Sequence, residues 1–171
     1  MNVVSSEKVF QGRALSLRVD QVRVNNGTFQ MEVLEHTGGV AVVPIDHDDN
    51  VLMVRQYRHA VGQSLLEIPA GTVKKGEDHA LCAARELQEE VGMKADKIDL
   101  IGEFFLAPGY SSELMRLYLA TGLTPSSLPQ DEDEEIAVEK IPFTQAVQMA
   151  IKGELRDAKS VTGLLLAERL R

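Results

Sequence analysis

The chain has 171 residues, which suits one compact domain and leaves little room for two independent cores. A formal net charge of -8 disfavours general DNA or RNA binding, because an acidic protein repels polyanions. No apolar run of about 18 residues is present to span a membrane, and the single cysteine, Cys82, excludes an intrachain disulfide. We expect a cytoplasmic protein that binds neither nucleic acid nor a membrane.

The N-terminal residues predict a small antiparallel β unit. Apolar and polar residues alternate on both sides of Asn26-Gly27, a strong hairpin signal, so strands are expected within residues 8–36. We assign residues 1–36 to an N-terminal β-strand subdomain and residues 37–171 to the main domain.

Short apolar segments predict the first strands of the main domain. Residues 40–44 and 51–54 flank the turn-forming cluster 47–50, and we expect the two segments to pair as a second hairpin. Another strand is expected at 65–68, ending at Pro69.

A helix is predicted over residues 78–91, with Gly92 where a helix C-terminal glycine belongs. One face of this helix is apolar, and we expect it to pack against the core. Its members are Ala80, Ala83, Ala84, Leu87 and Val91. The apolar neighbours of Cys82 favour a buried, structural thiol.

The second half of the chain predicts more strands and two closing helices. The strands are expected at 100–105, 114–120 and 136–141, and the helices at 143–152 and 157–170. A polar stretch at 121–135 ends in the acidic run 131–135. Strands interspersed with helices indicate a mixed α/β, or α+β, layered domain.

Three glutamates of the predicted helix are candidates for chemistry. Glu86, Glu89 and Glu90 stand at i, i+3 and i+4, so they fall within a sector of roughly 100°. Arg85 can pair with Glu89, but one arginine does not neutralise three carboxylates. A hard divalent cation would, and Mg²⁺ prefers carboxylate and phosphate oxygens. The alternative is a solvated acidic helix face.

The wider segment decides between these interpretations. It reads Gly, five residues, Glu, seven residues, Arg-Glu-apolar, one residue, Glu-Glu, one residue, Gly-apolar. The residues at these positions are Gly71, Glu77, Arg85, Glu86, Leu87, Glu89, Glu90, Gly92 and Met93. The segment resembles the box of the Nudix hydrolases, and chance agreement is on the order of one in a hundred million.

This resemblance implies a fold, a metal site and a reaction. The fold would be an α/β/α sandwich, here with an added N-terminal antiparallel β unit. Mg²⁺, with Mn²⁺ as a substitute, would serve attack of water on a nucleoside diphosphate. The implied metal ligands in the box are the Ala70 carbonyl, Glu86, Glu89 and Glu90, of which Glu90 is also a catalytic candidate. The implied structural residues are Gly71, Glu77, Arg85 and Gly92.

Segments outside the box resemble the ADP-ribose pyrophosphatase branch of the family. They are residues 54–59 leading to 66–71, residues 107–113, whose Pro108 stands 15 residues after Met93, and residues 153–160. The branch hydrolyses ADP-ribose to AMP and ribose 5-phosphate. A homodimer is also implied, in which the N-terminal unit reaches the second subunit.

Substrate contacts can be assigned to residues in these segments. Arg58 would pair with the diphosphate, with Arg55 as a second candidate. Glu67 would contact substrate or brace the site, and Ser112 and Glu113 would contact the terminal ribose. Ordinary surface ion pairing is the alternative for the arginines.

The acidic run supplies the remaining catalytic candidates. By analogy with the branch, Glu134 would lie on the metal side, Glu132 would be the general base, and Glu135 competes for both roles. A merely solvated loop is the alternative.

One departure from the branch concerns the nucleotide base. Several relatives stack adenine on an aromatic residue of the N-terminal unit, often Trp, whereas this chain has no Trp and only Phe10 and Phe29 in that region. Other nucleoside diphosphate sugars, such as GDP-mannose, therefore stay open as substrates. A non-catalytic nucleotide-binding regulatory module is a further alternative, against which the complete set of box carboxylates argues.

Overall fold

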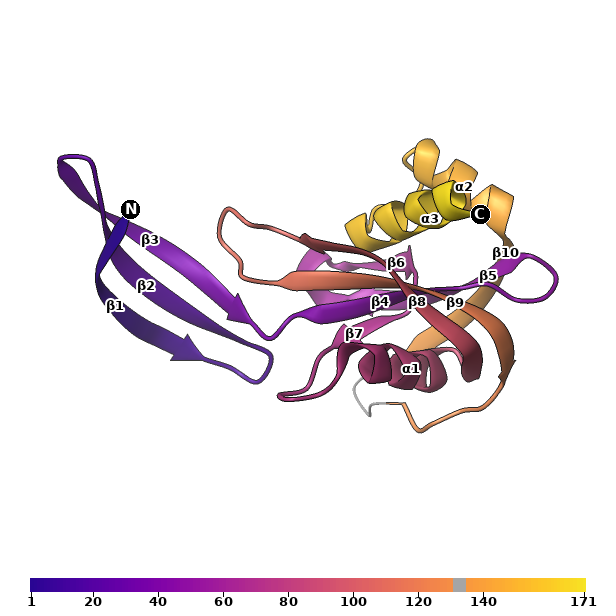
Figure 1. Cartoon of the computed structure of the whole chain (residues 1–171). Helices are drawn as coiled ribbons and strands as arrows, with labels where there is room; N and C mark the ends of the chain where they lie inside the picture. Colours follow the sequence, from indigo (N-terminus) through magenta and orange to yellow (C-terminus); the bar gives the residue numbers. More distant parts are fainter. Residues whose placement is uncertain (131–134) are drawn as a thin grey trace.

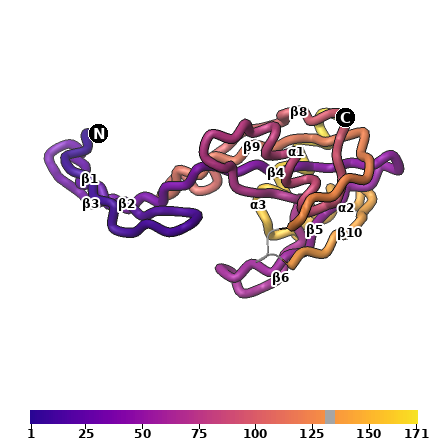
Figure 2. Tube along the Cα trace, turned by 90° about the horizontal axis from the view of Figure 1, so that it is seen from below, coloured from indigo at the N-terminus to yellow at the C-terminus, as the bar shows by residue number. Residues whose placement is uncertain are grey.

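The N-terminal strands form a sheet of their own in this computed structural model, which describes residues 1–130 and 135–171. The strands are β1 (Asn2–Gln11), β2 (Leu15–Val24) and β3 (Gly27–His36), with β2 in the middle. Figures 1 and 2 show this sheet projecting away from the rest of the molecule. Val24 pairs with Gly27 across a two-residue turn, which confirms the predicted hairpin. Asn25 has a φ of 51°, a left-handed conformation that asparagine tolerates.

Two further sheets build the main domain. The first has the order β7-β4-β9-β8 and the second β10-β5-β6. The strands are β4 (Gly39–Pro44), β5 (Asn50–Arg58), β6 (Gln63–Glu67), β7 (Ala70–Thr72), β8 (Met93–Phe105), β9 (Leu114–Pro125) and β10 (Ile136–Pro142). The helices are the short 3-10 helix η1 (His59–Val61) and α1 (His79–Glu90), α2 (Phe143–Ile151) and α3 (Ala158–Leu170).

The second predicted hairpin, between residues 40–44 and 51–54, is wrong. The turn forms, because the Asp46 carboxylate accepts hydrogen bonds from the backbone N–H groups of Asp48 and Asn50. Only the bridge between Ile45 and Val51 joins the two strands, after which they diverge into different sheets. β4 instead pairs in parallel with β9, and β5 pairs with β10 and β6.

Helices cover both faces of these sheets, as Figure 1 shows. Strand β4 is buried along its whole length. Ala41 and Val43 belong to the core beneath α2 and α3, whereas Val40 and Val42 belong to the core beneath α1. Because side chains alternate along a strand, one strand serves both cores. The fold is therefore the mixed α/β/α sandwich that was expected.

Several strands are longer than the sequence predicts. β1 begins at residue 2 rather than 8, β8 begins at 93 rather than 100, and β9 continues to 125 rather than 120. These extensions are rich in polar residues, so hydrophobic periodicity does not mark them. Backbone pairing forms them instead: β1 pairs with β2 from Asn2–Arg23 onward, and β8 pairs with β9 from Met93–Pro125 to Phe105–Leu114.

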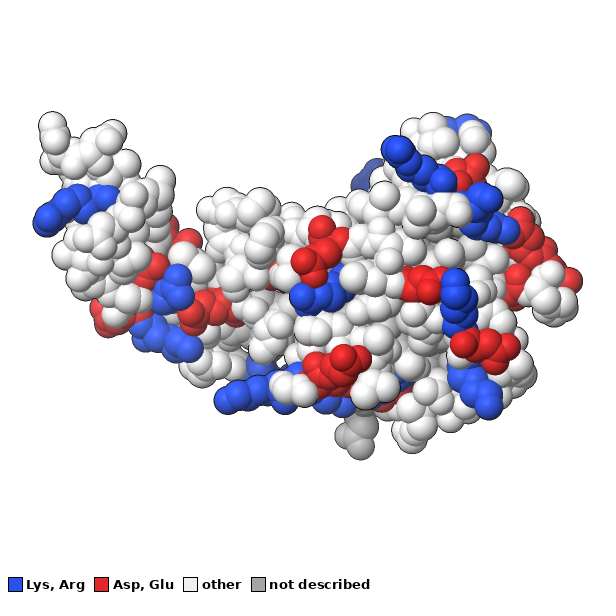
Figure 3. All heavy atoms as spheres, in the orientation of Figure 1, with Lys and Arg blue, Asp and Glu red and all other residues white. Residues whose placement is uncertain are grey.

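The described helices include none long and apolar enough to cross a membrane. On the face drawn in Figure 3, acidic and basic side chains are interspersed rather than gathered into one broad basic surface.

Candidate active site

Helix α1 is fixed at both ends by local signals in the sequence. Asp78 caps its N-terminus, with its carboxylate accepting hydrogen bonds from the N–H groups of Ala80 and Leu81 at 2.9 and 3.1 Å. Gly92 follows the C-terminus with a φ of 72°, the left-handed conformation that favours glycine at this position. The helix therefore starts and stops where the sequence predicts.

The box glutamates do not form a solvated helix face. Glu86 and Glu90 are only 7% and 2% exposed. Glu90 Oε2 accepts a hydrogen bond from the N–H of Ala70 at 3.0 Å. A Cβ atom at Gly71 would lie 2.0 Å from the Glu86 carboxyl carbon, so only glycine permits this approach. Two carboxylates thus converge on the strand Ala70–Thr72.

The buried face of α1 differs from the predicted apolar face. Ala80 is exposed, and Cys82 takes a buried place beside Ala83 and Leu87. Burial raises the pKa of the Cys82 thiol to about 12, so the thiol stays protonated at neutral pH. The structural interpretation of Cys82 fits this position.

One arginine holds three carboxylates of the box. Arg85 lies 2.9 Å from Glu77, 2.7 Å from Glu86 and 2.6 Å from Glu89. The hydrogen bonds from Arg85 are the main reason why the pKa of Glu77 falls to about 2. The same partners raise the pKa of Arg85. Three carboxylates share this one guanidinium, so the group keeps an excess of negative charge.

Arg58, which is partly exposed, forms an ion pair with the buried Glu67 near the box. The Arg58 guanidinium donates from Nε and Nη2 to the two oxygens of Glu67, at 2.8 and 2.7 Å. Lys159 contacts the same carboxylate from the start of α3. The sequence predicts no role for Lys159, although its segment, residues 153–160, resembles the ADP-ribose pyrophosphatase branch. Nothing in the local pattern reveals a contact that spans 92 residues.

The two arginine candidates point in different directions. Because side chains alternate along a strand, Arg55 and Arg58 lie on opposite faces of β5. Arg55 is exposed and pairs with Glu139 at 2.5 Å. It lines a hollow of about 230 Å³ together with Arg156 and Glu154. The structure therefore does not bring Arg55 to Arg58.

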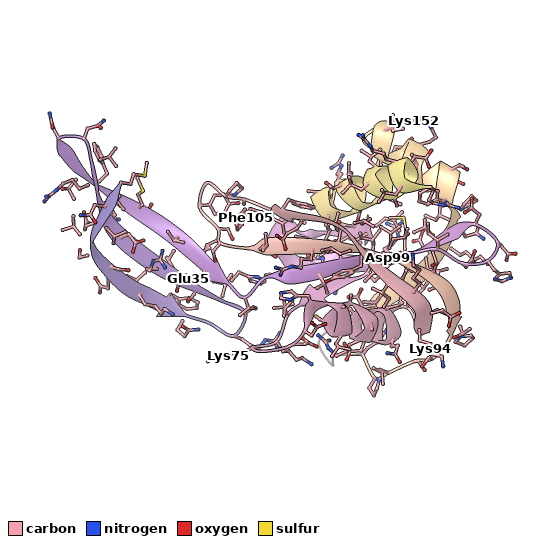
Figure 4. All side chains as sticks on the ribbon, in the orientation of Figure 1. Glu35, Lys75, Lys94, Asp99, Phe105 and Lys152 are labelled. Carbon is pink, nitrogen blue, oxygen red and sulfur yellow. The ribbon has the colours of Figure 1, made fainter. Side chains whose placement is uncertain are left out.

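The segment 107–113 ties the N-terminal sheet to the main domain. The Ser112 N–H donates to the Leu34 carbonyl at 2.9 Å, and the Ser112 hydroxyl accepts from the His36 N–H at 3.0 Å. The Glu113 carboxylate lies 3.8 Å from His36 Nδ1. Both predicted ribose contacts thus sit where the two parts of the molecule meet. Figure 4 shows Glu35 of β3 and Lys75 of the box loop at this junction.

Part of the acidic run lies outside the described residues. Glu132 and Glu134 are among residues 131–134, whereas Glu135 is exposed directly before β10. Ile136 pairs with Gln56, so Glu135 enters beside the end of β5 that carries Arg58. Upstream, the Leu128 N–H donates to the Gln88 carbonyl of α1 at 3.2 Å. The described flanks of the run therefore connect α1 with β5.

Comparison with known proteins identifies the family. The model of the NUDIX domain matches residues 35–164. The chain belongs to the Nudix family. It is 40% identical over 166 residues to the ADP-ribose pyrophosphatase of Mycobacterium tuberculosis, covering 95% of this chain and 80% of the relative.

Two further matches span nearly the whole chain. The methanol dehydrogenase activator of Bacillus methanolicus is 36% identical over 161 residues, covering 92% of this chain and 87% of the relative. A crystal structure of an ADP compounds hydrolase superposes with a TM-score of 0.87 at 26% identity, covering 99% of this chain and 92% of that one. The N-terminal sheet is thus included in the structural likeness.

The Nudix box supplies the donor chemistry for a divalent ion, but its carboxylates have other partners. Within residues 1–130 and 135–171, no three His, Cys, Asp or Glu side chains already stand together as a metal cage. Arg85 holds Glu86 and Glu89, and the Ala70 N–H holds Glu90. The carboxylates supply oxygen donors and an excess of negative charge, and Glu86 lies against Gly71. Both properties fit Mg²⁺.

Proposed function

We propose that the chain hydrolyses the diphosphate bond of ADP-ribose in a Mg²⁺-dependent reaction that yields AMP and ribose 5-phosphate. The observation that carries this proposal is the convergence of Glu86 and Glu90 on Ala70–Thr72 within a complete Nudix box. Similarity to an ADP-ribose pyrophosphatase over nearly the whole chain supports the choice of substrate.

The metal would be held by the carboxylates of Glu86, Glu89 and Glu90 and by the Ala70 carbonyl, and Mn²⁺ would serve in place of Mg²⁺. When bound, the ion supplies a counter-charge for the diphosphate and for the charge that develops in the transition state. The burial of Glu86 and Glu90 supports this assignment, because fixed carboxylates spare the reaction a reorganisation step.

Residues around the box would orient the substrate and the water. Arg58 would bind a diphosphate oxygen, and Glu67 would brace Arg58, since both Glu67 oxygens are already engaged. A glutamate of the acidic run, Glu132, Glu134 or Glu135, would accept a proton from the attacking water. Of these three, Glu135 alone lies within the described residues, directly before β10, which pairs with β5.

The remaining substrate contacts are proposed at the junction with the N-terminal sheet. Ser112 and Glu113 would hydrogen-bond the terminal ribose. Arg55 would contact the substrate only from the opposite face of β5 to Arg58, because it pairs with Glu139 there.

We also propose that the N-terminal sheet makes a homodimer. Several large apolar side chains on this sheet are exposed, and exposed apolar surface is typical of an interaction site. The exposed apolar residues are Val3, Val4, Val9, Phe10, Leu15 and Phe29. A second copy of the chain would cover them, which makes residues 1–36 a dimerisation subdomain.

A second candidate substrate is another nucleoside diphosphate sugar, such as GDP-mannose. The observation that favours it is the absence of Trp from the chain, which leaves no indole to stack on adenine. The metal site and the reaction would be unchanged, because the base lies outside the bond that is cleaved. The regulatory-module alternative is disfavoured, since a module that only binds nucleotide has no need of buried box carboxylates.

The test is a substrate panel with product analysis. Purified protein is incubated with Mg²⁺ and ADP-ribose, GDP-mannose, UDP-glucose, NADH or 8-oxo-dGTP, and the products are identified by mass. We expect ADP-ribose to give the highest kcat/KM, with AMP and ribose 5-phosphate as products. If GDP-mannose gives the highest kcat/KM, the proposed substrate is wrong and the proposed reaction stands. If no compound is hydrolysed, the chain is not a hydrolase of these compounds and the proposal is refuted.

A further inference from the structure

A buried carboxylate outside the box is held by two cations from distant segments. The Glu67 side chain is only 1% exposed. Arg58, nine residues away, donates two hydrogen bonds to it, and Lys159, which is 92 residues away, contacts its Oε2. Both oxygens of Glu67 are therefore fixed, one of them from two sides.

The start of α3 is built to hold this carboxylate. Asp157 caps the helix by accepting from the Ser160 N–H and hydroxyl at 3.0 and 2.5 Å, and its other oxygen lies 2.8 Å from Lys159 Nζ. The Ser160 hydroxyl accepts from the Ile68 N–H at 2.8 Å. We call Asp157, Lys159 and Ser160 the α3 clamp. The clamp fixes the Glu67 side chain and the backbone directly after it.

Stability alone does not account for the charges in this cluster. Taking an ion out of water costs several kcal/mol, so well-packed apolar residues stabilise a fold as well or better. Burial on its own would raise the pKa of Glu67, but the hydrogen bonds from Arg58 and the charge of Lys159 outweigh it, and the pKa is lowered. What charged partners add over apolar ones is a defined orientation, because their hydrogen bonds are directional.

The clamp leads directly to the box. Strand β6 ends at Glu67, and three residues later the Ala70 N–H binds Glu90. The charge of Glu90 contributes to the raised pKa of Arg58, so the guanidinium lies within its field. Arg58 is also 36% exposed, unlike Glu67 and Lys159. Arg58 is thus the member of the cluster that reaches solvent on the side of the box.

We propose that Lys159 is a positioning residue: by holding Glu67, it sets the guanidinium of Arg58 in the orientation that binds the substrate diphosphate. This inference rests on the proposed function, because it takes Arg58 as a substrate contact. Lys159 itself touches no substrate. Without Lys159, Glu67 would lose the contact that fixes its Oε2 from the second side, so the carboxylate and the Arg58 guanidinium bound to it would shift from this orientation.

A double-mutant cycle tests this coupling. We would measure kcat and KM for ADP-ribose with Mg²⁺ in wild type, Lys159→Met, Arg58→Gln and the double variant. Lys152→Met is the matched control, because Lys152 is an exposed lysine near the end of α2, on the outer side of the helices in Figure 4. Melting temperatures are recorded for every variant, and assays are run well below them.

We expect Lys159→Met to raise KM by roughly 10–100-fold with little change in kcat, as is typical of removing an outer partner of a site residue. Arg58→Gln should raise KM similarly, and the double variant should resemble Arg58→Gln alone. Lys152→Met should behave as wild type. If the two effects multiply in the double variant, or if Lys159→Met lowers stability without moving KM, the inference is overturned.

Two safeguards keep the outcome interpretable. If Lys159→Met does not fold, Lys159→Gln enters the same cycle, since it removes the charge and keeps an amide donor. Failure of both variants to fold would assign Lys159 to stability and overturn the inference. An inactive wild type would refute the proposed function itself, whereas an active wild type with independent effects refutes only the positioning role.

Discussion

At the scale of single residues, the site gathers three carboxylates around one guanidinium and a fourth carboxylate on a backbone N–H. Arg85 pairs with Glu77, Glu86 and Glu89, and the Ala70 N–H takes Glu90. Like charges so close would repel one another without such partners. Arg85 therefore keeps its three partners close together, and Glu86 and Glu89 lie where they would bind an ion.

The close approach at Gly71 gives the first prediction. Gly71→Ala would place a methyl group 2.0 Å from the Glu86 carboxyl carbon, so Glu86 or the strand must move. We expect a loss of about 1–3 kcal/mol in the free energy of unfolding. Displacing a ligand by about 1 Å should also lower kcat/KM by roughly 100-fold.

Denaturant unfolding and Mg²⁺-dependent hydrolysis check this prediction together. Gly109→Ala is the control for stability, because a Cβ atom at Gly109 meets nothing within 4 Å. Equal stability and activity of Gly71→Ala and wild type would show that Glu86 does not need this approach.

The ion pair between Glu77 and Arg85 gives a prediction on pH. The pKa of Glu77 is lowered from 4.5 to about 2 in the folded protein, mainly by the hydrogen bonds from Arg85. Because the folded pKa lies below the unfolded one, this stabilisation is present above about pH 4.5 and is lost as the pH falls toward 2. The pKa of Asp46 is also lowered to about 2, so the stabilisation that Asp46 contributes is lost over the same pH range.

We therefore expect the free energy of unfolding to fall less steeply between pH 5 and pH 2 in Glu77→Gln than in wild type. The part of the fall that is due to Asp46 should remain in the variant. Urea titrations at several pH values measure the slope. A slope that matches wild type would mean that Glu77 has the same pKa in both states.

Residue spacing predicts part of this site and misses part, for physical reasons. Helical geometry alone places Glu86, Glu89 and Glu90 together and puts Arg85 one turn from Glu89. It does not predict that Glu86 and Glu90 are buried, because their burial depends on where β7 packs. The contact between Lys159 and Glu67 is missed because tertiary folding, not local pattern, brings α3 to β6.

At the scale of elements, turn and cap chemistry is predicted well and pairing is not. The Asn-Gly hairpin and Gly92 each follow from a local requirement. The pairing of β4 with β9 joins residues more than 70 positions apart and carries no local signal, so a hairpin with β5 was wrongly expected. The polar ends of β8 and β9 were missed because their pairing is through the backbone.

The N-terminal sheet gives the prediction at this scale. Phe10 of β1 is 56% exposed. If a second copy covers this sheet, a charge at Phe10 would be buried without a partner, which costs far more than the lost contact. We expect wild type to be a dimer in light scattering and Phe10→Asp to be a folded monomer. Ser5→Asp, a change at an exposed polar residue of the same strand, should remain a dimer.

A monomeric wild type at micromolar concentration would contradict the dimer. So would a Phe10→Asp variant that dimerises as wild type does. Circular dichroism of each variant separates dissociation from unfolding.

At the scale of the whole molecule, one sandwich brings together segments that are far apart in the sequence. The box helix α1 lies on one face, α3 lies on the other, and both reach the strand ends between Glu67 and Thr72. The net charge of -8 would repel a diphosphate unless a cation and a few arginines acted locally. The architecture gathers those local devices at one place.

The most direct test of this account is an Mg²⁺ titration of ADP-ribose hydrolysis by wild type, Glu90→Gln and the control Glu168→Gln, an exposed residue of α3. We predict Mg²⁺-dependent turnover in wild type and control, and a loss of about 100-fold or more in Glu90→Gln with the fold intact. Near-normal turnover of Glu90→Gln, or turnover without any divalent ion, would contradict the assignment of the box as the catalytic metal site.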